Sequence, residues 1–260
     1  MLQNLKRLIQ ARDLLEAWTW RIIRARYQQS LLGGLWAVIQ PASTVIIFSI
    51  IFTRFMHVDT NGVPYVLFSF ATVVPWNLFA GSIADMVDSL VANINLVTKI
   101  YFPREILPAA AMLARLLDFG IASSIVVILM IYFQVPLFVQ GWVLIPVILV
   151  IQLALALGIG LVGAALNVFY RDVRQLFLLA IQLWMYASPV IYPVSAVPEQ
   201  LRFFYYINPM AGVIQAYRDV LLYETIPGIY LLWPAIAALG ILLFGYWFFR
   251  YVEYQFADVV

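Results

Sequence analysis

Two charged residues, Arg115 and Asp118, stand inside a long apolar stretch of the chain. Their spacing of three places both side chains on one face of a helix, where they could neutralise each other. Charges inside a membrane are costly, usually face the interior of a helix bundle, and often mark a pathway. An ion pair that only orders the bundle is the alternative interpretation. Asp85 and Asp88 have the same spacing near the end of another apolar stretch, where they could cap a helix or pair with basic residues.

A second group of charges lies near the start of the chain, in residues 1–32. Apolar residues recur there at steps of three and four, as on one stripe of a helix, at Leu5, Leu8, Ala11, Leu15, Trp18 and Ile22. Basic residues fill much of the other faces, at Lys6, Arg7, Arg12, Arg21, Arg24 and Arg26. This pattern predicts an amphipathic helix in the plane of a membrane interface; a helix packed on a partner protein is the alternative.

Three of these basic residues, Arg21, Arg24 and Arg26, are candidates for contact with a phosphate group. Guanidinium groups pair well with phosphate oxygens, which favours this role. A role in holding anionic lipid and fixing the topology fits the same residues equally well.

Several kinds of catalytic site find no support in the sequence. It has no cysteine, and its single histidine, His57, leaves little room for a metal site or a catalytic triad. Neither of the lysines, Lys6 and Lys99, stands in the G-x-x-x-x-G-K-[ST] pattern of a P-loop. We therefore expect no catalytic residue, no metal and no cofactor in this chain, and any ATP energy must come from a partner.

A glycine pattern at residues 158–163, GIGLVG, matches a dinucleotide-binding fingerprint by its letters. That fingerprint needs a strand before it and a helix that begins at the glycines, whereas this one lies inside an apolar run. Small residues four positions apart in the run instead predict that this helix packs closely on another.

The composition is typical of a membrane protein. Of the 260 residues, 65% are hydrophobic and 11% are charged, and the mean hydropathy is +0.95. Soluble domains average about 45–50% apolar and about 25% charged residues. The net charge of +2 is too small to indicate nucleic-acid binding. We expect an all-α polytopic membrane protein, because helices satisfy their own backbone hydrogen bonds in lipid.

Six apolar segments are long enough, or nearly so, to cross the roughly 30 Å of a bilayer's hydrocarbon core. They are residues 35–55, 65–84, 106–133, 142–168, 176–192 and 229–249. Most of the 15 Lys and Arg residues fall on one side if the N-terminus is cytoplasmic, as the positive-inside rule requires. Six spans then place both ends in the cytoplasm, and no polar linker divides the chain into further domains.

Two segments between the spans mix apolar, aromatic and charged residues. Residues 93–108 join the second and third spans, and are either a short amphipathic helix that contacts a protein or a loop in the membrane interface. Residues 193–228 precede the last span and are broken at Asn208-Pro209. Two short helices that dip into the outer leaflet and an external cap of two surface helices are equally good interpretations.

Six stretches together resemble the membrane subunit of ABC transporters that export polysaccharides. They are RYQQSLLGGLWAVIQP at 26–41, VPWNLFAGSI at 74–83, NLVTKIYFPREILP at 95–108, LNVFYRDVRQ at 166–175, LWMYASPVIYP at 183–193 and INPMAGVIQAYRDVLL at 207–222. Each stretch is weak alone, but they occur in the order of the family and span nearly the whole chain. Members of this family export lipid-linked O-antigen, capsule or teichoic acid chains.

The resemblance implies a homodimer of six-span subunits in the inner membrane of a bacterium. Two copies of a nucleotide-binding ATPase subunit, which hold ATP and Mg²⁺, would bind it on the cytoplasmic side. Residues 93–104 would form the coupling helix that docks on the ATPase, with the contact residues Asn95, Lys99, Tyr101, Phe102, Pro103 and Arg104. Residues 198–223 would form short extracytoplasmic gate helices, with the aromatics Phe203, Phe204, Tyr205, Tyr206 and Tyr217. Arg171 and Asp172 would lie in a cytoplasmic loop.

By the same resemblance, aromatic side chains would line a channel for the glycan between the two subunits, and membrane lipids would surround them. ATP binding would push the coupling helices, part the membrane subunits and admit the lipid-linked glycan. An ion-coupled secondary transporter could use the four intramembrane charges, but usually has an internal repeat, which we do not find. A membrane enzyme acting on lipid-linked sugars would need clustered carboxylates, histidines or metal ligands. A purely structural scaffold is a third alternative.

Overall fold

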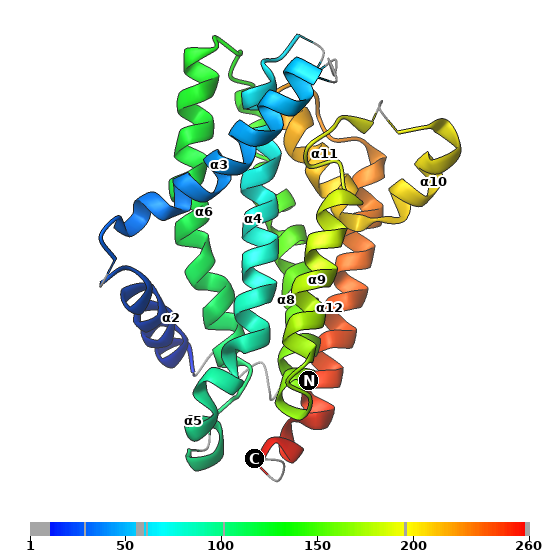
Figure 1. Cartoon of the computed structure of the whole chain (residues 1–260). Helices are drawn as coiled ribbons and strands as arrows, with labels where there is room; N and C mark the ends of the chain where they lie inside the picture. Colours follow the sequence, from blue (N-terminus) through cyan, green and yellow to red (C-terminus); the bar gives the residue numbers. More distant parts are fainter. Residues whose placement is uncertain are drawn as a thin grey trace.

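The computed structural model is a bundle of long helices (Figure 1). It describes residues 11–28, 30–55, 60, 62–100, 102–194 and 197–257, with the backbone alone at Leu201 and Phe204. No strand occurs among the described residues, and the predicted all-α fold is confirmed. Some residues of the sequence argument lie outside the described part, namely Lys6, Arg7, His57, Tyr101 and the side chain of Phe204.

The long helices account for most of the bundle. They are α3 (Trp36–Ile50), α4 (Tyr65–Ser89), α6 (Ile106–Tyr132), α8 (Ile145–Phe169) and α12 (Leu232–Val252). The shorter helices are α2 (Arg12–Tyr27), α5 (Ile94–Lys99), α7 (Val139–Trp142), α9 (Val173–Tyr186), α10 (Glu199–Ile207) and α11 (Pro209–Leu221). The single turns are η1 (Gly33–Leu35), η2 (Ile51–Phe55), η3 (Val91–Asn93), η5 (Ile229–Leu231) and η6 (Glu253–Ala257).

Five helical segments in the described part of the chain are long and apolar enough to cross a membrane. They are Gly33–Phe55, Tyr65–Ser89, Ile106–Tyr132, Val139–Phe169 and Ile229–Phe256, and each coincides with a predicted span. The remaining predicted span, residues 176–192, is helical only as far as Tyr186, at the end of the 14-residue α9. The presence of several membrane-spanning helices is thus confirmed, and their number of six stays a prediction.

α4 forms the centre of the bundle. In its most apolar stretch 78% of the residues are buried, against 11% in the segment that contains α3. α6, α8, α3, α9 and α11 all pack against it. The wide apolar faces that the outer helices leave uncovered are those expected of helices that meet lipid or another subunit.

α8 and α12 cross at two glycines. A Cβ atom on Gly245 would lie 2.2 Å from the carbonyl oxygen of Gly158, and one on Gly158 would lie 2.5 Å from that of Ile241. The two backbones are therefore in direct contact, as the small residues of this run predict. Gly160 and Gly163 of the same helix instead leave room for side chains of α4, those of Met86 and Val87.

The two ends of the bundle carry different short elements. Figure 1 shows α5 and η6 at the lower end, and the turn between α6 and α7 at the upper end. α10 and α11 lie beside the upper half of the bundle. α11 packs on α4, α8 and α12 and buries most of its apolar residues, so it is part of the bundle. Whether α10 and α11 dip into the outer leaflet or cap it stays a prediction.

Candidate functional site

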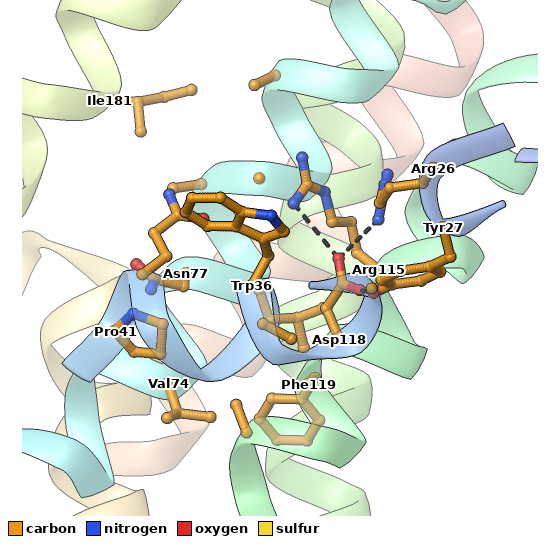
Figure 2. Close-up of a pocket in the computed structure, with 18 of the residues that line it drawn as sticks. Arg26, Tyr27, Trp36, Pro41, Val74, Asn77, Arg115, Asp118, Phe119 and Ile181 are labelled. Atoms are coloured by element: carbon orange, nitrogen blue, oxygen red, sulfur yellow. Dashed lines mark hydrogen bonds and ion pairs between the residues drawn. The ribbon is translucent and has the colours of Figure 1, made fainter. Parts of the chain in front are cut away.

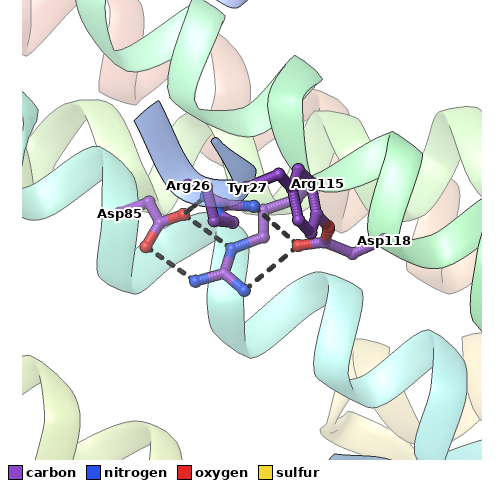
Figure 3. Close-up of polar contacts among 5 residues, drawn as sticks. All are labelled: Arg26, Tyr27, Asp85, Arg115 and Asp118. Atoms are coloured by element: carbon purple, nitrogen blue, oxygen red, sulfur yellow. Dashed lines mark hydrogen bonds and ion pairs between the residues drawn. The ribbon is translucent and has the colours of Figure 1, made fainter. Parts of the chain in front are cut away.

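Five side chains from three helices form a closed cluster of charges (Figure 3). Arg115 on α6 donates to both carboxylate oxygens of Asp85 on α4, with Nε–Oδ2 at 2.6 Å and Nη2–Oδ1 at 2.8 Å. Arg26, at the end of α2, donates to Asp85 Oδ2 and to Asp118 Oδ2, each at 2.6 Å. The Tyr27 hydroxyl donates to the other oxygen of Asp118. We call these five residues the charge cluster.

The charge cluster neutralises itself. Its two guanidinium groups face two carboxylates, and the four side chains are 17–26% exposed. Burial, and then the hydrogen bond to Asp118, raises the pKa of Tyr27 to about 12, so this phenol stays a neutral donor at physiological pH. Gly81 of α4 makes room for the cluster, because a Cβ there would lie 3.1 Å from the guanidinium carbon of Arg115.

A cavity of about 610 Å³ adjoins the charge cluster. Residues of α3, α4, α6 and α9 line it, together with the end of α2. The lining also includes an indole and two amides, those of Trp36, Gln40 and Asn77. Figure 2 shows the Trp36 ring between Asn77 and the Asp118 carboxylate. The cavity thus offers an aromatic face and neutral hydrogen-bonding groups, which suit a polar, uncharged ligand better than a free anion.

The other basic residues of α2 have different surroundings. The guanidinium of Arg21 lies 4.3 Å from the centre of the Trp18 ring, and its side chain is exposed. Arg24 is also exposed, and among the described residues no carboxylate pairs with it. Of the three candidates for a phosphate contact, Arg26 is therefore held by carboxylates, whereas Arg21 and Arg24 face outward.

Three further predicted residues lie at the end of the bundle that carries α5. Asp88 at the end of α4 lies 3.7 Å from Arg174 of α9, and both are partly exposed. Arg171 and Asp172 are exposed in the turn before α9.

The predicted coupling residues divide into two groups. Asn95 and Lys99 are exposed on α5, where a partner could reach them. Phe102, Pro103 and Arg104 are only partly exposed, and the Arg104 guanidinium binds other parts of this chain.

The chain is irregular after α9, and neighbouring side chains satisfy its carbonyl groups. Thr72 donates to the carbonyl oxygen of Val190, and Tyr65 to that of Ile191, each at 2.5 Å. Arg218 of α11 donates to the carbonyl oxygens of Val190 and Tyr192 at 3.2 and 3.3 Å. Irregular backbone at membrane depth is tolerated when it is buried in protein and its polar groups are paired, as they are here.

The predicted gate aromatics lie in two environments. Phe203 and Tyr206 of α10 are exposed, whereas Tyr205 is buried with its ring 6.2 Å from that of Tyr192. Tyr217 of α11 is buried at 1% exposure inside the bundle. The irregular segment is also tied to the start of α11, because the Asn208 amide donates to the Ser188 hydroxyl at 2.8 Å.

The comparison with known families matches residues 13–222, from α2 to the end of α11, to the family described as "ABC-2 type transporter". The chain belongs to the ABC-2 type transporter family. The matched part of this ABC-2 chain contains the whole charge cluster, α5 and both α10 and α11.

Curated relatives resemble the ABC-2 chain over most of its length. The O-antigen export system permease protein RfbA of Klebsiella pneumoniae is 28% identical over 249 residues, which are 95% of each chain. RfbA of Myxococcus xanthus is 29% identical over 94% of this chain and 93% of its own. The polysialic acid transport protein KpsM of Escherichia coli is 25% identical over 80% of each chain.

Sequence reasoning missed two parts of this site. Trp36, Gln40 and Asn77 were assigned only to spans, since a single polar or aromatic residue in an apolar run does not reveal which way it faces. Arg218 lies in the segment expected to form the gate helices, where the sequence gives it no role of its own. A charge among the apolar residues of a short helix was the available signal.

Proposed function

We propose that this chain is the membrane subunit of an ABC transporter that exports lipid-linked polysaccharide, driven by a separate ATPase subunit. The observation that carries the proposal is the likeness, over some 95% of both chains, to permease proteins named for O-antigen export. The glycan is of the O-antigen or capsule type, and teichoic acid is the third class that the family resemblance suggests.

The cavity supports a sugar as the transported group. Sugar hydroxyls bond with amides such as those of Gln40 and Asn77, and the apolar face of a sugar ring stacks on an indole such as Trp36. The self-neutralised charge cluster leaves no free charge on this wall. A neutral wall lets successive sugar units pass without binding one of them tightly.

A second copy of the chain would complete the channel. α3 and α9 line the cavity, and both present exposed apolar residues, including Ile39 and Ile47 on α3 and Leu179 and Leu183 on α9. Two copies that meet along these helices would cover this surface and enclose the two cavities between them. A homodimer is therefore part of the proposal. So is the cytoplasmic position of both ends of each chain, which the positive-inside rule predicts.

The ATPase would bind at the end that carries α5. Asn95 and Lys99 are exposed there, and the outward-facing Arg24 of α2 is free to meet the pyrophosphate of the substrate. ATP and Mg²⁺ would be bound by the ATPase subunit and not by this chain.

Reconstitution of the chain with its ATPase in liposomes tests the function. A fluorescent lipid-linked glycan in the inner leaflet should become accessible to an external glycosidase when ATP is added. The same liposomes with a partner ATPase that cannot hydrolyse ATP should show no transfer. Transfer that ignores ATP but follows a proton gradient would contradict the proposal and favour an ion-coupled transporter.

The dimer is tested separately, by cysteine cross-linking. The chain has no cysteine of its own, so each introduced cysteine can be joined only to the same position of a second copy. Single cysteines placed at Ile47 or Leu183 should form disulfide-linked dimers in membranes. A cysteine at Leu239, on the exposed face of α12, is the matched control and should not. Cross-linking at Leu239 alone would place the dimer interface on the wrong side of the bundle.

A further inference from the structure

Arg104 belongs to the segment expected to meet the ATPase, but its guanidinium binds the C-terminal end of the chain instead. Nη1 donates to the carbonyl oxygen of Glu253 in η6. Nη2 lies 3.4 Å from the carbonyl oxygen of Val97 in α5. The guanidinium carbon is 5.7 Å from the centre of the Phe256 ring. One side chain therefore links α5 to η6, the turn that follows α12.

The residue next to Arg104 makes a second link to the same region. Glu105 is only 6% exposed, and its carboxylate lies 3.6 Å from Nη1 of Arg250, near the end of α12. The same nitrogen pairs with Glu253 at 2.7 Å. Of these two consecutive residues after α5, the basic one thus binds η6 and the acidic one binds the end of α12.

A small apolar core, separate from the main one, underlies these polar links. Phe256 of η6 is fully buried in it, with its ring 5.6 Å from Phe249 of α12 and 5.8 Å from Phe169 of α8. Val97 of α5 is buried in the same core at 1% exposure. The turn η6 is therefore packed against α5.

This packing matters because α5 has no continuous helical connection to α6. α5 has only six residues, and the backbone turns extended at Ile100, with φ −128° and ψ 135°. A proline follows at Pro103. A push on α5 would be partly absorbed by bending at this link, because it is not a continuous helix. Side-chain packing on η6 provides a second and stiffer connection.

We propose that Arg104 and Phe256 are positioning residues that make α5 and the end of α12 move as one body. A push from the ATPase on α5 is then delivered to α12, and through its glycine contact to α8, rather than to α6 alone. This inference rests on the proposed function in one respect, which is that α5 receives the push.

The first experiment measures coupling in the reconstituted transporter, as glycan molecules exported per ATP hydrolysed. Arg104→Ala and Phe256→Ala should assemble with the ATPase and hydrolyse ATP, but export at least about tenfold less glycan per ATP. Tyr254→Ala is the matched control, because this aromatic residue of the same turn is 64% exposed, and its ratio should not change. Wild-type export per ATP in both variants would overturn the proposal.

A covalent link tests whether the loss comes from separation of the two elements. In the Arg104→Ala variant, cysteines at Val97 and Phe256 are joined by oxidation, and the disulfide should restore export. If the disulfide forms and export stays low, Arg104 acts in some other way and the proposal fails. If Arg104→Ala reduces the amount of complex, Arg104→Lys is measured instead. Lysine keeps the charge but cannot donate to the carbonyl oxygens of Glu253 and Val97 together.

A distance measurement separates this inference from the proposed function. Spin labels at Asn95 and Tyr254 should keep one narrow distance with and without ATP in the wild type, and a broad distribution in Arg104→Ala. If no glycan is exported at all but the distances behave in this way, the transport function is wrong and the connection stands. A narrow distance in both proteins, or one that changes with ATP in the wild type, would overturn the connection.

Discussion

Arg115 on α6 holds both carboxylate oxygens of Asp85 on α4, across 30 positions of sequence, at 2.6 and 2.8 Å. The partner suggested by its spacing, Asp118, is at 3.4 Å and meets only one nitrogen. A guanidinium fork is planar and bonds best with a carboxylate that faces it from another helix. Asp118 lies on the same helix and instead binds Arg26 and Tyr27.

Replacing Arg115 by Gln should destabilise the protein by about 2–3 kcal/mol, because it leaves partly buried carboxylates with one guanidinium in place of two. Arg174→Gln is the matched control. That guanidinium is 54% exposed and lies 3.7 Å from Asp88, so its loss should cost less than about 1 kcal/mol. Thermal unfolding in detergent measures both. Equal shifts in the two variants would show that the charge cluster does not stabilise the bundle.

Replacing Arg26 by Gln should loosen α2 from the bundle, because Arg26 joins α2 to α4 and α6. Amide hydrogen exchange of residues 12–27 should become at least about tenfold faster, which corresponds to about 1.4 kcal/mol. Arg24→Gln is the control for the helix, since Arg24 is exposed and should leave the exchange unchanged.

The same two variants separate anchoring from substrate binding. If Arg24 meets the pyrophosphate of the substrate, Arg24→Gln should weaken export without changing the exchange of α2. Unchanged export in Arg24→Gln would remove this residue from the substrate path. Raising the pH from 6 to 9 should not free α2, because a phenol whose pKa is raised from 10 to about 12 loses its proton only above that range.

Gly245→Ala should destabilise the contact between α8 and α12 by at least about 1–3 kcal/mol, because the new methyl group would meet backbone that cannot move aside. Gly240→Ala is the matched control on the same helix, since no atom lies within 4 Å of its Cβ position. It should be neutral or stabilising by up to about 1 kcal/mol, as Ala is the better helix former. Unfolding in detergent should show the control at least as stable as the wild type and Gly245→Ala much less stable.

Local patterns in the sequence predicted much of this fold. Long apolar runs located five helices that the structure contains, and the proline and asparagine breaks located α10 and α11. These features depend on neighbouring residues, so one sequence is enough to see them. Glycines in the run that forms α8 also predicted a close contact, although not that α12 was the partner.

The candidate site was harder to predict because it depends on contacts between distant segments. Arg26 is 59 positions from Asp85 and 92 positions from Asp118, and nothing in these spacings pairs them. The family resemblance implies an ATPase contact for Arg104, which stays a prediction, but it does not reveal the contact of this side chain with Glu253, 149 positions away. The end of α9 at Tyr186 also depends on distant residues, because Thr72, Tyr65 and Arg218 satisfy the backbone that follows it.

Arg218→Met should be the most damaging substitution in α11. The side chain is 1% exposed, donates to the carbonyl oxygens of Val190 and Tyr192, and lies over the Phe68 ring with its guanidinium carbon 3.9 Å from the ring centre. Burial disfavours the charged form of a guanidinium, because the group loses its contacts with water. The carbonyl oxygens and the aromatic ring compensate for this loss. Methionine fills similar space and leaves one of the two carbonyls unpaired, since Thr72 still serves Val190.

We expect Arg218→Met to cost about 2–4 kcal/mol, from the loss of hydrogen bonds to a charged group and one orphaned carbonyl. Hydrogen exchange should rise most in residues 187–192, because that segment loses its support before the long helices do. Arg202→Met in α10 is the control, since that side chain is 37% exposed and, among the described residues, pairs with Glu199 and the carbonyl oxygen of Val197. If Arg202→Met destabilises the protein as much as Arg218→Met, or if exchange rises elsewhere first, Arg218 does not hold the irregular segment in place.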